Sequence, residues 1–280
     1  MTWRSPARSH KVETIVYPII FQFGPITVYS FGVLMAVGFY LGASLAVAEY
    51  RRRGGDGEQM WNLLVWVFLG GLVGSKLLSV AADIDGFIGD PIGHFFSGSG
   101  FVWYGGLIGG FGTAFVLRSR YKMAMMTLLD CCALGLPIGQ AIGRLGCHVA
   151  GDGDWGIVTD LPWGVAYTNA IVGWDYAAGT TVHPTPIYEA AAYTTVFLSL
   201  WKLRTRQLAP GVLFSLYLVG NATARFVVEF IRINPRIALG LSQAQFIAIA
   251  LFVLGLGWMV HTRRSAGAAR SPAATEEAGA

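Results

Sequence analysis

Seven apolar stretches dominate the sequence. Each is close to the roughly 20 helical residues that the hydrocarbon core of a bilayer requires. They cover residues 28–48, 60–82, 103–117, 123–142, 186–203, 212–230 and 244–261. Of the 280 residues, 54% are hydrophobic and 13% are charged, whereas soluble domains carry about 25% charged residues. We therefore expect an all-α polytopic membrane protein with about seven transmembrane helices.

The charges of the loops alternate along the chain. Loops rich in Lys and Arg stay in the cytoplasm, and such loops follow the first, third, fifth and seventh stretches, while the loops after the second and fourth stretches are acidic. The pattern predicts an amino terminus outside and a carboxyl terminus in the cytoplasm, although the basic residues of the first eleven positions oppose it. The basic loops contain Arg51, Arg52, Arg53, Arg118, Arg120, Lys122, Lys202, Arg204, Arg206, Arg263, Arg264 and Arg270, and the acidic ones Asp83, Asp85, Asp90, Asp152, Asp154, Asp160 and Asp175.

Three regions follow from this pattern. Residues 1–27 are expected to form an extracytoplasmic arm, whose apolar part, residues 15–26, is too short and too interrupted by Pro and Gly to span, so it should lie at the surface. Residues 28–262 should form the seven-helix transmembrane domain, with an outside loop at 145–184. Residues 263–280 are rich in Ala, Gly and Ser and should form a disordered cytoplasmic tail.

The cysteines and histidines predict neither a disulfide framework nor a metal site. Cys131 and Cys132 are adjacent in an apolar stretch, where small buried packing residues are the expected role. The five histidines are scattered, without the spacings that metal sites use. We therefore expect no metal and no organic cofactor.

Five basic residues fall outside the cytoplasmic loops and the amino-terminal arm. The predicted orientation places them toward the outer face, where a charge within a span costs about 2.5–3.5 kcal/mol on insertion scales and needs a partner or a function. They are Lys76, Arg144, Arg225, Arg232 and Arg236.

Two interpretations of these cations remain open. Glu229 lies four residues after Arg225 and three before Arg232, so the three can form a structural ion-pair network on one helical face. Alternatively, one carboxylate leaves a surplus of cations, which favours an anionic ligand such as a phospholipid phosphate. The planar guanidinium suits two phosphate oxygens at once.

Uncharged polar residues join the same zone. Tyr104 begins the third stretch, either as a functional group or as an interfacial aromatic residue beside Trp103. His183, Tyr188 and Glu189 belong to the segment HPTPIYE that precedes and opens the fifth stretch. Asp130 lies toward the other face, so we expect it to be a structural hydrogen-bonding group.

Several motifs, taken in order, resemble the prolipoprotein diacylglyceryl transferase family. Their order and spacing agree along roughly residues 17–260, which is far more specific than any single motif. The motifs are YGGLIGG at 104–110, GQAIGRLG at 139–146, HPTPIYE at 183–189, RFVVEFIR at 225–232 and SQAQ at 242–245.

The resemblance implies a seven-helix membrane enzyme with its amino terminus outside. Members transfer the diacylglyceryl group of phosphatidylglycerol to the lipobox cysteine of a prelipoprotein, form a thioether and release glycerol phosphate. The implied place is the bacterial inner membrane, with the active site toward the outer leaflet. The implied partners are phosphatidylglycerol, the prelipoprotein signal peptide and membrane lipids, and we expect no nucleic-acid partner.

The resemblance also implies roles for individual residues. Arg144 and Arg225 would stabilise the leaving phosphate, and Tyr104, at a family histidine position, would take the thiol proton or only hydrogen-bond the lipid. The remaining implied substrate-binding residues are Lys76, Arg232, Glu229, His183, Tyr188, Asp152 and Asp154. Lys76 stands where the family has arginine, and Asp152 or Asp154 where it has glutamate.

Departures from the family pattern keep other functions open. Cys147 and Ala150 replace two family asparagines, and Cys147 is either a small filling residue or a transient acceptor. A divergent transferase with another acceptor would fit these changes. A non-enzymatic carrier of an anionic lipid or solute would be expected to show two related halves and interrupted helices, and the sequence shows neither.

Overall fold

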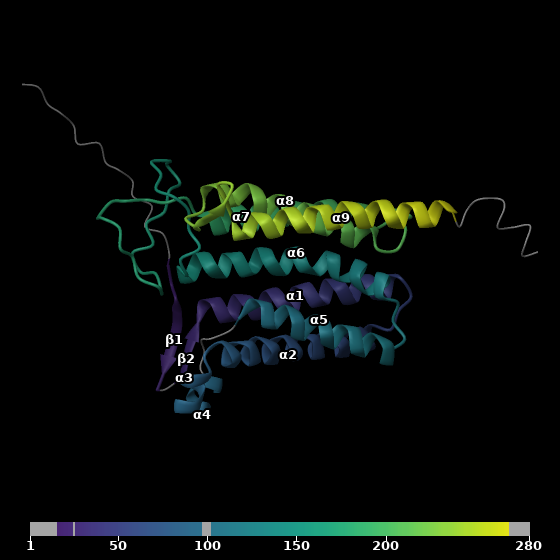
Figure 1. The fold of residues 1–280 in the computed structure, drawn as a ribbon, viewed down its shortest axis with the longest axis horizontal. Coiled ribbons are helices and arrows are strands. Elements are labelled where there is room, and N and C mark those ends of the chain that lie inside the picture. The colour runs from purple at the N-terminus through teal and green to yellow at the C-terminus, as the bar shows by residue number, and fades with distance from the viewer. Residues whose placement is uncertain (1–15, 25, 97–101, 269–280) are drawn as a thin grey trace, which may run out of the picture.

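Long helices that run side by side form most of the protein (Figure 1). The computed structural model describes residues 16–24, 26–96 and 102–268. The long helices are α1 (Ser30–Arg52), α2 (Gly57–Ala82), α5 (Trp103–Arg120), α6 (Met125–Ala150), α7 (Thr185–Leu203), α8 (Val212–Val228) and α9 (Gln243–Ala268). Short helices α3 (Ile84–Gly89) and α4 (Pro91–Phe96) follow α2, and the 3₁₀ helix η1 (Glu229–Ile231) continues α8.

Five helical segments of the described chain are long and apolar enough to cross a membrane. They are Ser30–Arg52, Gly57–Ala82, Met125–Ala150, Val212–Ile231 and Gln243–Arg264. The polytopic prediction is therefore confirmed for five of the seven expected spans. Helices α5 and α7 lie alongside the others in Figure 1, but they have only 18 and 19 residues and include polar positions.

Two short hairpins make the fold mostly helical rather than all-α. Strands β1 (Ile19–Phe23) and β2 (Ile26–Tyr29) pair antiparallel, as do β3 (Arg236–Ala238) and β4 (Leu241–Ser242). Gly24, with φ of +57°, adopts the left-handed backbone at the first turn. The stretch 15–26, expected to lie at the surface, largely forms this exposed β1 hairpin, and residues 1–15 of the expected arm lie outside the described residues.

Two expected boundaries differ in the structure. Helix α6 continues to Ala150, so the outside loop begins near residue 151 rather than at 145. Gly146 lies within the helix and packs closely against α1, since a Cβ at this position would lie 3.3 Å from the Leu34 side chain. Gly151, with φ of +63°, provides the left-handed cap that ends it. Helix α9 runs to Ala268, past the expected boundary at 262, and residues 269–280 lie outside the described part of the chain.

Close glycine contacts hold two helix pairs together. A Cβ at Gly105 of α5 would overlap the carbonyl oxygen of Gly74 in α2, and one at Gly135 of α6 would overlap that of Gly42 in α1. Small residues let helix backbones approach in this way within membranes. Helix α6 also packs against α7 and α8, which places it in the middle of the bundle.

The two ends of the bundle differ in chemistry. The basic turns α1–α2, α5–α6 and α7–α8 lie at one end in Figure 1, and the first hairpin, α3, α4 and the 151–184 loop lie at the other. At the basic end, Asp130 accepts hydrogen bonds from the backbone amides of Gly211 and Phe214 at 2.9 and 3.0 Å. The structural role expected of Asp130 is therefore confirmed.

Candidate functional site

Three arginines and three carboxylates converge at the end opposite the basic turns. Helix α6 supplies one arginine near its end, and helix α8 with the segment after it supplies the other two. The carboxylates come from α7, from η1 and from the loop after α6. The six residues, which we call the arginine cluster, are Arg144, Arg225, Arg232, Asp154, Glu189 and Glu229.

Glu189 lies at the centre of the cluster and contacts all three arginines. Its carboxylate is 2.9 Å from Arg144 Nε, 2.5 Å from Arg225 Nη1 and 3.2 Å from Arg232 Nη1. The side chain is fully buried, where an unpaired carboxylate would be very costly. We named Glu189 from its motif but assigned it no role, although an acid inside an apolar stretch is itself a signal that a cation lies nearby.

Glu229 forms the second centre, as its spacing predicted. Arg225 Nη2 lies 2.9 Å from Glu229 Oε2, and Arg232 Nε lies 3.6 Å from the same oxygen. The other oxygen, Oε1, accepts hydrogen bonds at 2.7 Å from Asn234 Nδ2 and Ser242 Oγ. Ser242 opens the SQAQ segment, so this motif supports the cluster from the start of α9.

Asp154 reaches the cluster because the chain turns back after α6. The left-handed Gly151 ends the helix, and the carboxylate of Asp154 then pairs with both Arg144 and Arg232. Thr185 Oγ1 donates to the Asp154 carbonyl oxygen at 2.5 Å, which holds the loop against α7. Burial would raise the pKa of the Asp154 carboxyl, but the charges of the two arginines outweigh it and lower that pKa.

The charge balance of the cluster differs from our expectation. We expected one carboxylate to face three or four cations, and this is wrong, because Asp154 and Glu189 fold in beside Glu229. Arg236 stands apart: it donates to Gln245 Oε1 at 2.9 Å and to the carbonyl oxygens of Glu229 and Phe230. The ion pairs of residues 16–24, 26–96 and 102–268 include none with Arg236. The structural ion-pair network is therefore present, with one cation beside it.

Part of the cluster is exposed. The side chains of Arg144 and Arg225 are 23% and 21% exposed and that of Asp154 is 30% exposed. Arg232 is only 5% exposed. A ligand can therefore reach Arg144 and Arg225 directly, while the more buried Arg232 shares the carboxylate of Glu189 with both.

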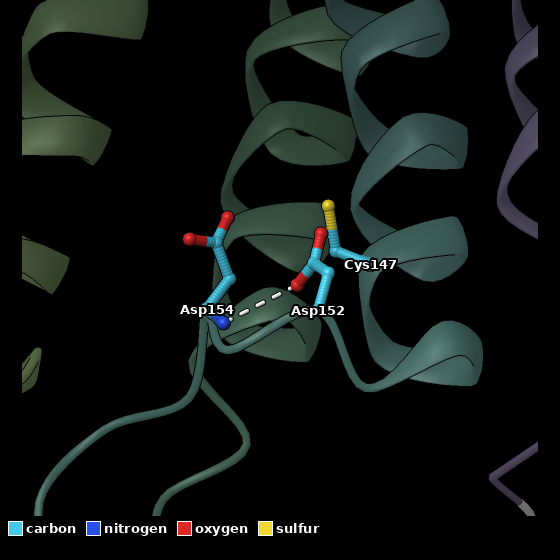
Figure 2. A group of neighbouring side chains, drawn as sticks. All are labelled: Cys147, Asp152 and Asp154. Atoms are coloured by element: carbon cyan, nitrogen blue, oxygen red, sulfur yellow. Dashed lines mark hydrogen bonds between the residues drawn. The ribbon is translucent and has the colours of Figure 1, made fainter. Parts of the chain in front are cut away.

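A thiol and two carboxylates, from Cys147, Asp152 and Asp154, lie close together (Figure 2). The ligand atoms of Cys147, Asp152 and Asp154 lie within 4.8 Å of one another, which is close enough for a metal ion. Arg144 Nη1, however, lies 3.8 Å from Cys147 Sγ and also pairs with Asp154. Because a positive charge already sits against two of the three groups, a further cation is disfavoured.

Asp152 differs from Asp154 in its surroundings. It accepts the backbone N–H of Asp154 at 3.2 Å, and the ion pairs of the described chain do not include it. Burial raises the pKa of the Asp152 carboxyl, and the charge of Asp154 adds to this; together they outweigh the hydrogen bond with the Cys147 thiol.

The other expected site residues make contacts outside the arginine cluster. Tyr104 is half-exposed at the start of α5 and its hydroxyl accepts from Gln243 Nε2 at 3.2 Å. Lys76 is buried on α2, the helix that packs on α5. His183 Nδ1 lies 3.2 Å from the Tyr188 hydroxyl, which also accepts from Trp163 at 2.8 Å. The structure thus joins Arg144, Arg225, Arg232, Glu229 and Asp154, places Asp152 beside them, and holds the remaining four on neighbouring elements.

Comparison with known families identifies the kind of protein to which this cluster belongs. The family profile described as prolipoprotein diacylglyceryl transferase matches residues 18–261, which is most of the chain. The chain belongs to the prolipoprotein diacylglyceryl transferase family. The matched region contains every member of the arginine cluster and both glycine-paired helix seams.

Individual relatives agree along nearly their whole length. Phosphatidylglycerol–prolipoprotein diacylglyceryl transferase of Clostridium tetani is 30% identical over 85% of this chain and 95% of its own. The proteins of the same name from Pseudoalteromonas atlantica and Halalkalibacterium halodurans are 31% and 32% identical, over 87% and 86% of this chain and 88% and 86% of theirs. The resemblance stated from the motifs is confirmed, and the chain is a multi-pass membrane protein of a transferase family.

Proposed function

We propose that this protein transfers the diacylglyceryl group of phosphatidylglycerol to the lipobox cysteine of prelipoproteins. The observation that carries the proposal is the partial exposure of Arg144 and Arg225 in the arginine cluster of a chain of this family. The names of the relatives supply the donor and the acceptor class. No metal or organic cofactor takes part in the proposed reaction.

The proposed reaction is a displacement at a glycerol carbon. The lipobox thiol attacks the carbon that carries the phosphate ester, a C–S bond forms, the C–O bond breaks, and glycerol phosphate leaves. Negative charge grows on the departing phosphate, and cations that are already oriented stabilise it without reorganisation. Arg144 and Arg225 take this role, with Arg232 as the positioning residue beside them.

The carboxylates of the cluster explain how the arginines can be held ready before the lipid arrives. Glu189 and Glu229 fix the guanidinium planes, and a phosphate at Arg144 then competes with the partly exposed Asp154. Arg236 adds a cation beside the cluster. The bound phosphate therefore meets a preorganised site of nearly balanced charge, which avoids leaving several cations unpaired in the empty enzyme.

The thiol also needs a proton acceptor, because its pKa is near 8.5 and the thiolate is the nucleophile. Tyr104, as the phenolate, is our candidate: it takes the thiol proton and becomes a neutral phenol, and its contact with Gln243 links it to the SQAQ motif at the start of α9. Lys76, His183, Tyr188, Asp152 and Asp154 are proposed to contact the lipid headgroup or the peptide.

The proposed topology has seven spans, with α5 and α7 as the third and fifth. The amino terminus lies outside, the carboxyl terminus lies in the cytoplasm of a bacterium, and the cluster faces the outer leaflet of the inner membrane. The basic turns at one end of the bundle support this orientation.

Asp85→Cys and Asp160→Cys should react with a membrane-impermeant thiol reagent in intact spheroplasts, whereas Arg120→Cys and Arg206→Cys should react only after permeabilisation. The parent protein, with its own three cysteines, is the control, and the reverse labelling would reject the orientation.

The function is tested with purified protein, phosphatidylglycerol and a lipobox peptide. Mass spectrometry should find the peptide heavier by one diacylglyceryl group, and a peptide with Ser in place of Cys should stay unmodified. Arg144→Ala and Arg225→Ala should each lower turnover by about 10²–10³-fold, the range seen when an oriented donor is removed. Lysine at either position should restore only part of it, because lysine lacks the planar fork.

Arg120→Ala is the matched control, because this exposed arginine lies at the opposite end of the bundle. It should keep parental turnover. Parental turnover in either cluster variant would remove that arginine from the mechanism. Absence of product with phosphatidylglycerol, together with product from another phospholipid, would reject the donor.

A further inference from the structure

An apolar groove lies at the basic end of the bundle, away from the arginine cluster. It has a volume of about 750 Å³, within the usual range of ligand pockets. Its walls come from α9, from the start of α6 and from the loop between α7 and α8. The lining includes Met126, Pro210, Leu254, Gly257, Trp258 and His261.

The groove is lined almost entirely by apolar atoms, and its open side faces outward from a membrane-spanning helix. Leu254 is 53% exposed, although it lies in the middle of α9. Trp258 at the groove packs edge-to-face on Phe214 with ring centroids 5.6 Å apart, so this wall is fixed rather than loose. In a bilayer the surroundings of such a groove are hydrocarbon chains.

Basic residues stand at the end of the groove nearest the turns. Arg264 lies three residues after His261 and seven after Gly257, so it continues the helical face that lines the groove. Lys122 precedes Met126 by four residues, and Arg206 precedes Ala209 by three. All three cations are exposed, and no described residue that lines the groove is acidic.

We propose that this groove is a binding site for an anionic glycerophospholipid of the leaflet at the basic end of the bundle. One acyl chain lies along Leu254, Gly257 and Trp258, and the headgroup phosphate meets Arg264, Arg206 and Lys122. Charge complementarity commits the site to an anionic lipid, since basic clusters at a membrane surface attract such headgroups by about 1 kcal/mol per cation. The site is separate from the proposed donor site and does not depend on the proposed reaction.

Gly257 gives a sharp test, because a Cβ at this position would meet no other atom within 4 Å. A leucine at this position, which lines the groove, is therefore expected to occupy part of it. Gly112 on α5 has the same open surroundings, so Gly112→Leu adds the same side chain on another helix. The two variants differ in whether the groove is filled.

The experiment uses the full chain in lipid nanodiscs that contain a photoactivatable phosphatidylglycerol or phosphatidylcholine with identical acyl chains. After illumination and digestion, mass spectrometry locates the label. We expect residues 253–262 to be labelled at least about fivefold more by phosphatidylglycerol than by phosphatidylcholine, which is the ratio that the roughly 1 kcal/mol of a single cation gives. Gly257→Leu should lose this label and Gly112→Leu should keep it.

A double variant, Arg206→Gln with Arg264→Gln, should reduce the phosphatidylglycerol label to the phosphatidylcholine level. This double variant still tests the proposed lipid site if Gly257→Leu does not fold. Equal labelling of the parent by both lipids, or labelling that Gly257→Leu leaves unchanged, would overturn the proposal. No label from either lipid, or a label that appears only after residues 269–280 are removed, would mean that protein covers the groove and would overturn it as well. Turnover of the same samples reports on the proposed function separately.

Discussion

The carboxylate of Glu189 lies 2.5 Å from the guanidinium of Arg225, across the interface between α7 and α8. The acid is fully buried, whereas the side chain of the arginine is partly exposed. A buried charge is tolerated only when it is paired, so the two positions depend on each other. The acid thereby determines where the arginine can meet a ligand, although it need not touch that ligand itself.

The first prediction concerns Glu189 as a positioning residue. Glu189→Gln should leave three arginines without their shared carboxylate and should destabilise the protein by about 3–5 kcal/mol, the cost of breaking a buried ion pair. In the fraction that folds, turnover should fall about 10²-fold through misplacement of the arginines. Glu189→Asp should recover part of both losses, and the exposed Glu58→Gln should change neither the thermal midpoint nor kcat/KM.

The second prediction concerns Tyr104. If its hydroxyl takes the thiol proton, Tyr104→Phe should lower kcat by about 10²–10⁴-fold with little change in lipid binding. Higher pH should restore part of the rate, because more of the substrate thiol then ionises unaided. Gln243→Ala removes only the donor to this hydroxyl and should have a much smaller effect. Superimposable pH–rate profiles of the parent and Tyr104→Phe would end the assignment as base.

The third prediction follows from the raised pKa of the Asp152 carboxyl. A carboxyl with a raised pKa in the folded state is harder to ionise there than in the unfolded chain. The resulting cost is absent below the ordinary value of 3.8 and grows as the pH rises through the folded value. Asp152→Asn should therefore raise the thermal midpoint more at pH 7 than at pH 4, whereas the exposed Asp160→Asn should show no such difference.

Asp154 should behave in the opposite sense. Its pKa is lowered, so the stability that it contributes is present above the ordinary carboxyl value and is lost as the pH falls through the folded value. Asp154→Asn should consequently cost stability at pH 7 and progressively less in acid. Identical pH dependences for the variants at 152 and 154 would contradict the different surroundings of the two carboxyls.

The fourth prediction concerns Cys147, which is buried beside Arg144. Cys147→Ser should keep turnover within about tenfold, or roughly 1.4 kcal/mol in the barrier. A diacylglyceryl thioether on Cys147 would lack the phosphate leaving group that drives the proposed transfer, which favours a filling role. Mass spectrometry of the parent incubated with phosphatidylglycerol alone should find no lipid on this cysteine. A trapped adduct, with an inactive but folded serine variant, would show the transient acceptor instead.

The cluster shows which parts of the site could be predicted from the sequence. The pairing of Glu229 with Arg225 and Arg232 depends on helical spacing alone, so it was predictable. The pairing of Glu189 with Arg225 joins residues 36 positions apart, and that of Asp154 with Arg232 joins residues 78 apart. Both depend on how helices pack and on the turn at Gly151, which spacing does not encode. For this reason we expected a surplus of positive charge where the folded chain has a balance.

Some features of the helices could also be predicted from the sequence, and others could not. The spans α1, α2, α6, α8 and α9 were predictable because hydropathy over 20 or so residues reports directly on membrane crossing. The extension of α6 past Gly146 was not, because glycine there faces α1 as a packing contact instead of ending the helix. The hairpin of β1 and β2 was missed because its residues are mostly apolar, without the regular alternation that predicts a strand.

The glycine contacts between α2 and α5 and between α1 and α6 leave backbone against backbone along both seams. No acyl chain can pass between helices that already touch in this way. A two-tailed donor and a product that carries two new tails therefore have to enter and leave on other sides of the bundle. The positions of these glycines therefore help to determine by which route lipids enter and leave the bundle.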